Sequence, residues 1–238
     1  MKTNENELLD FMKKPIGRGG FLKYTGAVLA TTGLVMAGCK KDKKTEEEAP
    51  PATEDKGVNL GSGDIGVLNY AYALEQLEAA FYTKVMDSPF SGMTAEETQI
   101  LSDLKLHEIA HREFLKAALG ASAIQALEVN FASIDFTNRS SVLNTAKAFE
   151  DLGVAAYNGA GKLIVDPNYL LIAGKIVSVE ARHASAIRDL LNPKSSDFAG
   201  DDVIDINGLD GAKTPSQVLA IAGSYIKTKI DASNLPTS

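Results

Sequence analysis

The chain has 238 residues, of which 45% are hydrophobic and 23% are charged, and these are the proportions of an ordinary globular protein with one core and appendages. Its formal net charge of −7 argues against nucleic-acid binding, which needs a basic surface. Tryptophan is absent and aromatic residues make up only 7% of the chain, so a platform for stacking bases or sugars is not expected.

The first 38 residues have the order of an export signal. Polar and basic residues up to Lys23 precede an apolar run over residues 25–38. A run of about 14 residues is too short to span a bilayer as a helix but is typical of a signal peptide. It ends in Met36-Ala37-Gly38-Cys39, which resembles a bacterial lipobox. We therefore expect Cys39, the only cysteine, to be lipidated rather than buried as a free thiol in an N-terminal helix.

The same region bears on the export route, and the residues after it form the tether to the folded domain. Residues 17–23 resemble the twin-arginine export motif, but Gly19 stands in place of the second arginine, so twin-arginine and general secretory export both remain open. Residues 40–56 are rich in Lys, Glu and Pro and cannot bury enough apolar surface to fold. We expect a signal peptide over residues 1–38, a disordered tether over 39–62, and a bacterial lipoprotein anchored to a membrane of the cell envelope.

Four long helices and a shorter fifth are predicted after the tether. Apolar residues recur every three or four positions from residue 64 to residue 86, as on an amphipathic helix. Thr94 and Glu97 form a capping signal for the second helix. The remaining boundaries come from proline, glycine and asparagine signals, and they predict helices over residues 95–119, 140–163, 166–192 and 214–230.

Two long connections separate these helices. Residues 121–138 show no sustained helical period, and we expect an extended segment long enough to cross a helical bundle. Residues 193–238 are predicted to form an acidic loop followed by the fifth helix. The aspartates of the loop suggest calcium, but they lack the spacing and terminal Glu of an EF-hand, so a solvated loop is the better interpretation.

A Glu-x-x-His motif occurs twice. Glu108 and His111 form the first copy, and Glu180 and His183 repeat it 72 residues later. Side chains three residues apart on a helix project from one face, about one turn apart. Each copy therefore presents a carboxylate and an imidazole to the same neighbour.

The helices that precede these motifs also match each other. Residues 74–82 align with residues 149–157, which pairs Glu75 with Glu150 and Glu78 with Gly153. Glu75 is therefore a better candidate ligand than Glu78. Two Glu-x-x-His helices, with one further Glu from each of two partner helices, are the ligand set of a di-metal carboxylate bundle. The candidate metal ligands are Glu75, Glu108, His111, Glu150, Glu180 and His183.

This pattern, together with the segment Leu74-Glu75-Gln76-Leu77-Glu78-Ala79-Ala80-Phe81-Tyr82, resembles the ferritin-like superfamily, and specifically bacterial ferritin-like domain proteins. The resemblance covers about residues 63–192. It implies an all-α, left-handed four-helix bundle with a long crossover between its second and third helices, where residues 121–138 lie. It also implies that Glu108 and Glu180 bridge two metal ions, each completed by one further Glu and one His.

The charge of this set indicates its cofactor. Four glutamates in an apolar core need a counter-charge, and two divalent cations supply it. Carboxylate and imidazole ligands together suit Fe or Mn, with O₂ or peroxide as the natural small oxidant. We expect an oxidoreductase of the ferroxidase, peroxidase or catalase-like kind. The alternative is a non-catalytic metal-binding or structural protein of the envelope with the same bundle. The sequence leaves the oligomeric state open.

Two further patterns have competing interpretations. His107 to His111 satisfies the zinc-protease pattern, but the metzincin extension is absent and the second Glu-x-x-His would be unexplained. His107 is better interpreted as a surface residue or a hydrogen-bond partner of a ligand. Tyr82 and Tyr157 each follow a candidate Glu by seven residues, so they are either partners of the metal ligands or ordinary packing residues. With its single cysteine assigned to lipid, the chain has no rubredoxin-type iron site.

Overall fold

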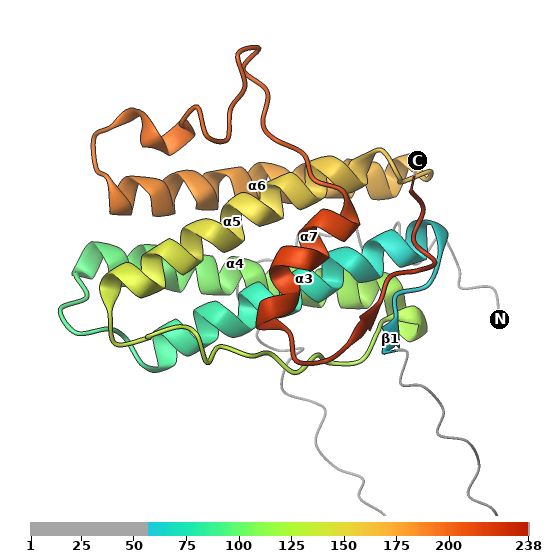
Figure 1. The fold of residues 1–238 in the computed structure, drawn as a ribbon, viewed down its shortest axis with the longest axis horizontal. Helices are drawn as coiled ribbons and strands as arrows, with labels where there is room; N and C mark the ends of the chain where they lie inside the picture. Colours follow the sequence, from blue (N-terminus) through green and yellow to red (C-terminus); the bar gives the residue numbers. More distant parts are fainter. Residues whose placement is uncertain (1–56, 238) are drawn as a thin grey trace, which may run out of the picture. The chain divides into compact units, whose positions relative to one another are not determined.

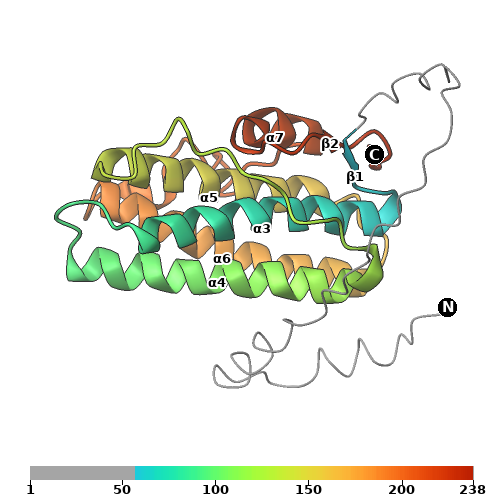
Figure 2. The same cartoon turned by 90° about the horizontal axis from the view of Figure 1, so that it is seen from below.

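The computed structural model describes residues 57–237; the predicted signal peptide, Cys39 and the tether up to residue 56 lie outside the described residues. Four long helices form the body, namely α3 (Gly63–Asp87), α4 (Ala95–Leu119), α5 (Arg139–Gly161) and α6 (Pro167–Leu191). α3 packs along α4, and α5 packs along α6, so that two helical hairpins make one bundle (Figures 1 and 2). The predicted all-α four-helix bundle is confirmed. Among the described residues, no helix has the length and apolar character needed to cross a membrane.

Local capping explains where the helices begin. Thr94 Oγ1 accepts a hydrogen bond from the Glu97 backbone N–H, and the Glu97 carboxylate accepts one from the Thr94 N–H, which completes a capping box. Asn138 and Asp166 cap α5 and α6 more simply, each accepting a backbone N–H with its side-chain oxygen. Glu97 also pairs with Arg139 at the start of α5, so the capping residue of one hairpin ties it to the other.

The predicted crossover between α4 and α5 is present. A short 3-10 turn, η1 (Gly120–Ser122), leads into an irregular segment that runs lengthwise along the bundle before α5 begins (Figure 2). Buried amides on α3 hold it in place. Asn69 donates to the Ser122 carbonyl and accepts from the Ile124 N–H, and Gln76 accepts from the Leu127 N–H. These bonds pair partly buried backbone groups of the crossover that are outside any helix or strand.

The chain after residue 214 differs from the prediction of one helix over residues 214–230. Helix α7 covers only Pro215–Ala222 and is followed by a 3-10 turn, η3 (Gly223–Tyr225). Beyond it, β2 (Ile230–Asp231) pairs in parallel with β1 (Val58–Asn59). After η3 the backbone pairs with the crossover segment instead of continuing the helix, since the Tyr225 carbonyl accepts from the Asn130 N–H and the Lys227 N–H donates to the Glu128 carbonyl. The predicted tether is also too long at its end, since β1 belongs to the fold and Leu60 is fully buried.

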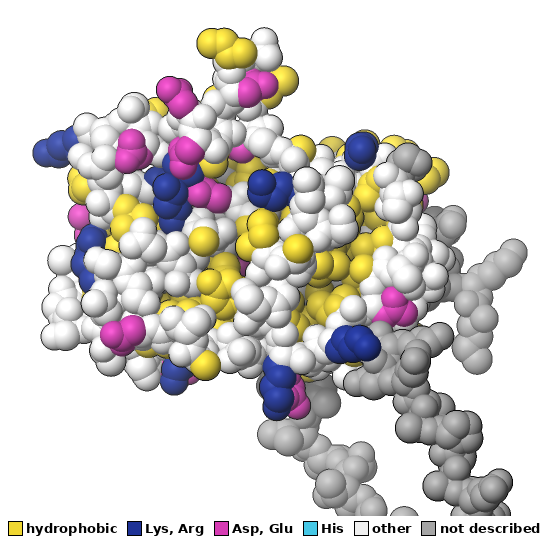
Figure 3. Space-filling view, viewed as in Figure 1, with side chains coloured by type: hydrophobic (Ala, Val, Ile, Leu, Met, Phe, Trp, Pro, Cys, Tyr) yellow, Lys and Arg dark blue, Asp and Glu magenta, His cyan; other side chains and the backbone are white. Residues whose placement is uncertain are grey.

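One arginine attaches the acidic loop to the bundle. Arg188 on α6 is 2% exposed and pairs bidentately with both Asp151 on α5 and Asp202 in the loop. The loop is mostly exposed, as expected of a solvated loop, and Asp202 ties it to a buried arginine. On the face shown in Figure 3, acidic and basic side chains are interspersed, and no histidine is visible.

Candidate metal centre

Each of the four long helices turns at least one candidate ligand into the centre of the bundle. The four glutamates are fully buried, and the side chains of His183 and His111 are 3% and 14% exposed. Their ligand atoms form two overlapping groups, each within 4.8 Å: Glu75, Glu108, His111 and Glu180, and Glu108, Glu150, Glu180 and His183. Helix α3 supplies Glu75, α4 supplies Glu108 and His111, α5 supplies Glu150, and α6 supplies Glu180 and His183.

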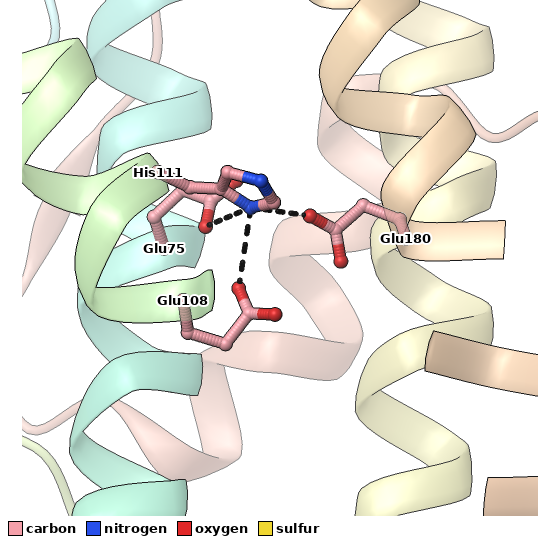
Figure 4. A group of neighbouring side chains, drawn as sticks. All are labelled: Glu75, Glu108, His111 and Glu180. Carbon is pink, nitrogen blue, oxygen red and sulfur yellow. Dashed lines mark ion pairs between the residues drawn. The ribbon is translucent and has the colours of Figure 1, made fainter. Parts of the chain in front are cut away.

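In the first group, the carboxylates surround one imidazole nitrogen (Figure 4). His111 Nδ1 lies 2.8 Å from Glu180 Oε1, 3.6 Å from Glu75 Oε2 and 3.7 Å from Glu108 Oε2. The residues come from three helices, so the group exists only in the assembled bundle.

The second group has the same arrangement with the two halves exchanged. His183 Nδ1 lies 2.7 Å from Glu108 Oε1, 3.3 Å from Glu180 Oε2 and 3.5 Å from Glu150 Oε2. Glu108 and Glu180 belong to both groups and offer one oxygen to each imidazole. Their position matches the bridging role that the family resemblance implies for them.

These converging atoms have almost no hydrogen bonds. Eight buried ligand atoms lack a hydrogen-bond partner among the described residues: Glu75 Oε2, both oxygens of Glu108, His111 Nδ1, Glu150 Oε2, both oxygens of Glu180, and His183 Nδ1. The two closest contacts, His111 Nδ1 with Glu180 Oε1 at 2.8 Å and His183 Nδ1 with Glu108 Oε1 at 2.7 Å, are ion pairs when the imidazoles are protonated. Lone pairs that face one another in an apolar core are costly unless a cation lies between them. The donor set therefore fits a metal ion in each group.

The remaining oxygens of the two terminal glutamates are occupied by tyrosines. Tyr82 on α3 donates to Glu150 Oε1 at 2.5 Å, and Tyr157 on α5 donates to Glu75 Oε1 at 2.5 Å. Each tyrosine thus reaches across to the glutamate of the other half. Burial and the nearby carboxylates raise the pKa of both phenols, so both remain donors. The hydrogen bonds leave one oxygen of each glutamate facing the centre, which favours the partner role over simple packing.

A comparison with known families agrees with this arrangement. The profile of the ferritin-like domain matches residues 63–193, more than half of the chain. The chain belongs to the ferritin-like domain family. The matched region starts with α3 and ends just after α6, so it contains all six candidate ligands. No curated protein matches the sequence.

His107 is the residue of this ferritin-like domain whose role the sequence left undecided. Its Nδ1 lies 2.9 Å from His183 Nε2, and the two rings stack with centroids 5.2 Å apart. His107 belongs to neither ligand group. It contacts the outer nitrogen of a candidate ligand, which disfavours the zinc-protease pattern, where both histidines would bind one ion. The equivalent position in the second half is Val179, so His111 has no counterpart of this contact.

Protonation of the ferritin-like centre without metal follows from its charges. Burial alone would lower the pKa of His183, but contacts with Glu108, Glu150 and Glu180 raise it to about 12. Burial alone would raise the pKa of Glu180, but the two imidazoles lower it to about 2. Two protonated imidazoles therefore partly balance the glutamates. Because a histidine ligand must be neutral, metal binding has to release these protons.

Glu78 is buried beside the centre without joining either group. It is 4% exposed, and burial together with the neighbouring carboxylates raises its pKa well above the ordinary value. A methyl group added at Gly153 would lie 3.1 Å from Glu78 Oε1. Glycine at that position therefore leaves room for the Glu78 carboxylate.

Proposed function

We propose that the ferritin-like domain binds two iron or manganese ions and reacts with O₂ or peroxide, as a ferroxidase, a peroxidase or a catalase-like enzyme. The observation that carries the proposal is the pair of overlapping ligand groups with eight unpaired buried atoms. Two divalent cations would balance the four glutamates, and mixed oxygen and nitrogen ligands suit iron and manganese. When bound, these metals supply redox chemistry toward small oxidants.

The protein side chains have separate roles in this proposal. Glu108 and Glu180 would contribute one oxygen to each ion because each belongs to both groups. Tyr82 and Tyr157 hold the terminal glutamates with one oxygen turned inward. The apolar core around the six ligands excludes bulk water, which strengthens the electrostatic interactions among them.

Metal analysis of the purified full-length chain tests the proposal. We expect about two Fe or Mn ions per chain after anaerobic loading, and we expect the double variant Glu108→Ala/His183→Ala to bind none. Glu128→Ala is the matched control, because Glu128 is an exposed glutamate that pairs only with Lys227. A wild-type chain without metal, or with one zinc that survives His183→Ala, would refute the dinuclear site. Loaded protein that consumes neither O₂ nor H₂O₂ would favour the non-catalytic alternative.

We also propose that the domain is tethered to an envelope membrane by lipid on Cys39. The support is the lipobox-like sequence and the Lys/Glu/Pro-rich segment that follows it. Cys39→Ser should abolish labelling by a radioactive fatty acid and release the protein from the membrane fraction. If the variant stays membrane-bound and the wild type is not labelled, the lipid anchor is wrong.

A further inference from the structure

A small apolar cavity lies at one end of the bundle, where α5 ends and α6 begins. Its volume is about 20 Å³, and residues of all four long helices line it. The buried part of its wall includes Leu74, Leu115 and Ile176, and its rim includes the half-buried Ile164 and Ala173. The cavity therefore extends from the surface into the core.

The buried end of this cavity lies beside one of the two ligand groups. Leu115 follows His111 by four residues, and Ile176 precedes Glu180 by four. Residues four apart on a helix are neighbours on one face, one turn apart along the axis. The wall thus begins one turn from the ligands of the first group.

Tyr157 forms the direct link between the cavity and the centre. It lines the cavity, and its hydroxyl donates to Glu75 Oε1 at 2.5 Å. A single side chain therefore separates a molecule in the cavity from a ligand of the His111 group.

Toward the other end of α3, an aromatic cluster packs between α3, α5 and the crossover segment. Phe81 makes edge-to-face contacts with Phe149 and Phe131 at ring-centroid distances of 5.1 and 6.1 Å, and Phe136 packs against it at 5.9 Å. The apolar cavity therefore lies on the side of the centre away from this aromatic cluster, beside the His111 group.

The size and polarity of the cavity favour some small molecules over others as its occupant. A volume of roughly 10–15 Å³ is needed to hold one water molecule, so this cavity suits a molecule of one or two heavy atoms. Water and peroxide would lose hydrogen bonds in an apolar wall, at a cost of several kcal/mol, whereas dioxygen would not. The hydroxyl of Tyr70, which also lines the cavity, has no hydrogen-bond partner among the described residues and offers one donor. A peroxide molecule has two O–H donors and would leave at least one unpaired.

We propose that this cavity binds dioxygen and holds it beside the Glu75, His111 and Glu180 group. The proposal rests on the proposed function and narrows it, because it makes O₂ rather than peroxide the oxidant that enters through this end.

Xenon tests the cavity without any metal, since apolar cavities of protein cores bind it. We expect one xenon atom per chain in the metal-free, full-length protein, detected by ¹²⁹Xe NMR and located in a xenon-pressurised crystal. Ala173→Phe at the rim should abolish binding, and Ile164→Phe is the second rim variant if the first does not fold. Ala186→Phe on the same helix is the matched control, since Ala186 is half-buried and outside the cavity.

The same variants then test the identity of the oxidant. The iron-loaded Ala173→Phe protein should consume O₂ about tenfold more slowly, or slower still, because dioxygen is no longer held beside the ligands. Its metal content and its rate of H₂O₂ consumption should be unchanged. Ala186→Phe should leave all three quantities unchanged. Absence of bound xenon, or an unchanged O₂ rate in Ala173→Phe, would overturn this proposal. Neither result affects the metal stoichiometry on which the proposed function depends, so the two failures are distinguishable.

Discussion

Replacing His107 with alanine should weaken one of the two proposed metal subsites and leave the other unchanged. His183 turns Nδ1 to the carboxylates and Nε2 to His107 Nδ1, 2.9 Å away. For Nδ1 to bind a cation, the ring must carry its proton on Nε2, which then donates to His107. His107 therefore fixes both the tautomer and the orientation of His183. Val179, which takes the equivalent place in the second half, cannot do this for His111.

The size of the effect follows from the exposure of His107. Loss of a hydrogen-bond partner of a metal ligand costs about 10- to 100-fold in metal affinity. His107 is exposed, so water can replace part of the lost bond, and we expect the lower end. A tenfold loss is about 1.4 kcal/mol.

Anaerobic titration of the metal-free, full-length protein with Mn²⁺, followed by calorimetry, measures this difference. His107→Ala should weaken one binding step about tenfold and leave the other unchanged. His107→Gln, which retains a hydrogen-bond acceptor, should recover part of the loss, and Val179→Ala should change neither step. The reasoning is refuted if both steps weaken equally in His107→Ala, or if neither does.

Three further predictions concern stability. Tyr82→Phe and Tyr157→Phe each leave a carboxylate oxygen unpaired in the core, so each should lower the free energy of unfolding of the metal-free protein by about 1–3 kcal/mol in urea; no measurable change would contradict the hydrogen bonds. Gly159→Ala would place its methyl group 1.8 Å from a backbone carbonyl oxygen of the segment before α7 and should destabilise by about 1–3 kcal/mol, whereas Gly174→Ala meets nothing within 4 Å and should stabilise its helix by up to about 1 kcal/mol; equal melting temperatures would refute the close approach. A hydrogen-bonded arginine lowers the pKa of Asp202 to about 2, so the stabilisation it provides is present above the unfolded pKa of about 4 and is lost as pH falls toward 2. Since Asp202 is mostly exposed, wild type and Asp202→Asn should differ by less than about 1 kcal/mol at pH 6 and converge near pH 2; a constant difference would argue against the ion pair.

Features that depend on neighbours in sequence were predicted well. The Thr94 capping box and the proline at the start of α6 fix helix boundaries within a few residues, so they are visible without tertiary information. The convergence of the six candidate ligands was also predictable, because a three-residue spacing on a helix fixes which side chains share a face. The choice of Glu75 over Glu78 needed only the internal repeat, and Glu75, not Glu78, lies in a ligand group.

Features that depend on how distant segments meet were left open or were not predicted. His107 was expected to be either a surface residue or a hydrogen-bond partner of a ligand. The contact between His107 and His183 requires a particular rotation of α4 against α6, which no local pattern encodes. The pairing between β1 and β2, which follows α7, joins Val58 and Ile230 from opposite ends of the described chain. A helical pattern was visible after residue 214, but the competing strand partner was not.

The departures from the internal repeat bear on how the two ions would differ. A perfectly repeated sequence would give two equivalent subsites. Here His183 donates a hydrogen bond to His107, whereas the His111 subsite has the apolar cavity one turn away. The side chain of Glu78 fills the space opposite Gly153, so the core is unequal there too. Firm support of a metal ligand needs close packing, whereas entry of a small molecule needs space. One subsite cannot meet both needs, and in this bundle each subsite meets one of them. We therefore expect the ion beside His183 to bind more tightly, and the ion beside His111 to be the first that dioxygen meets.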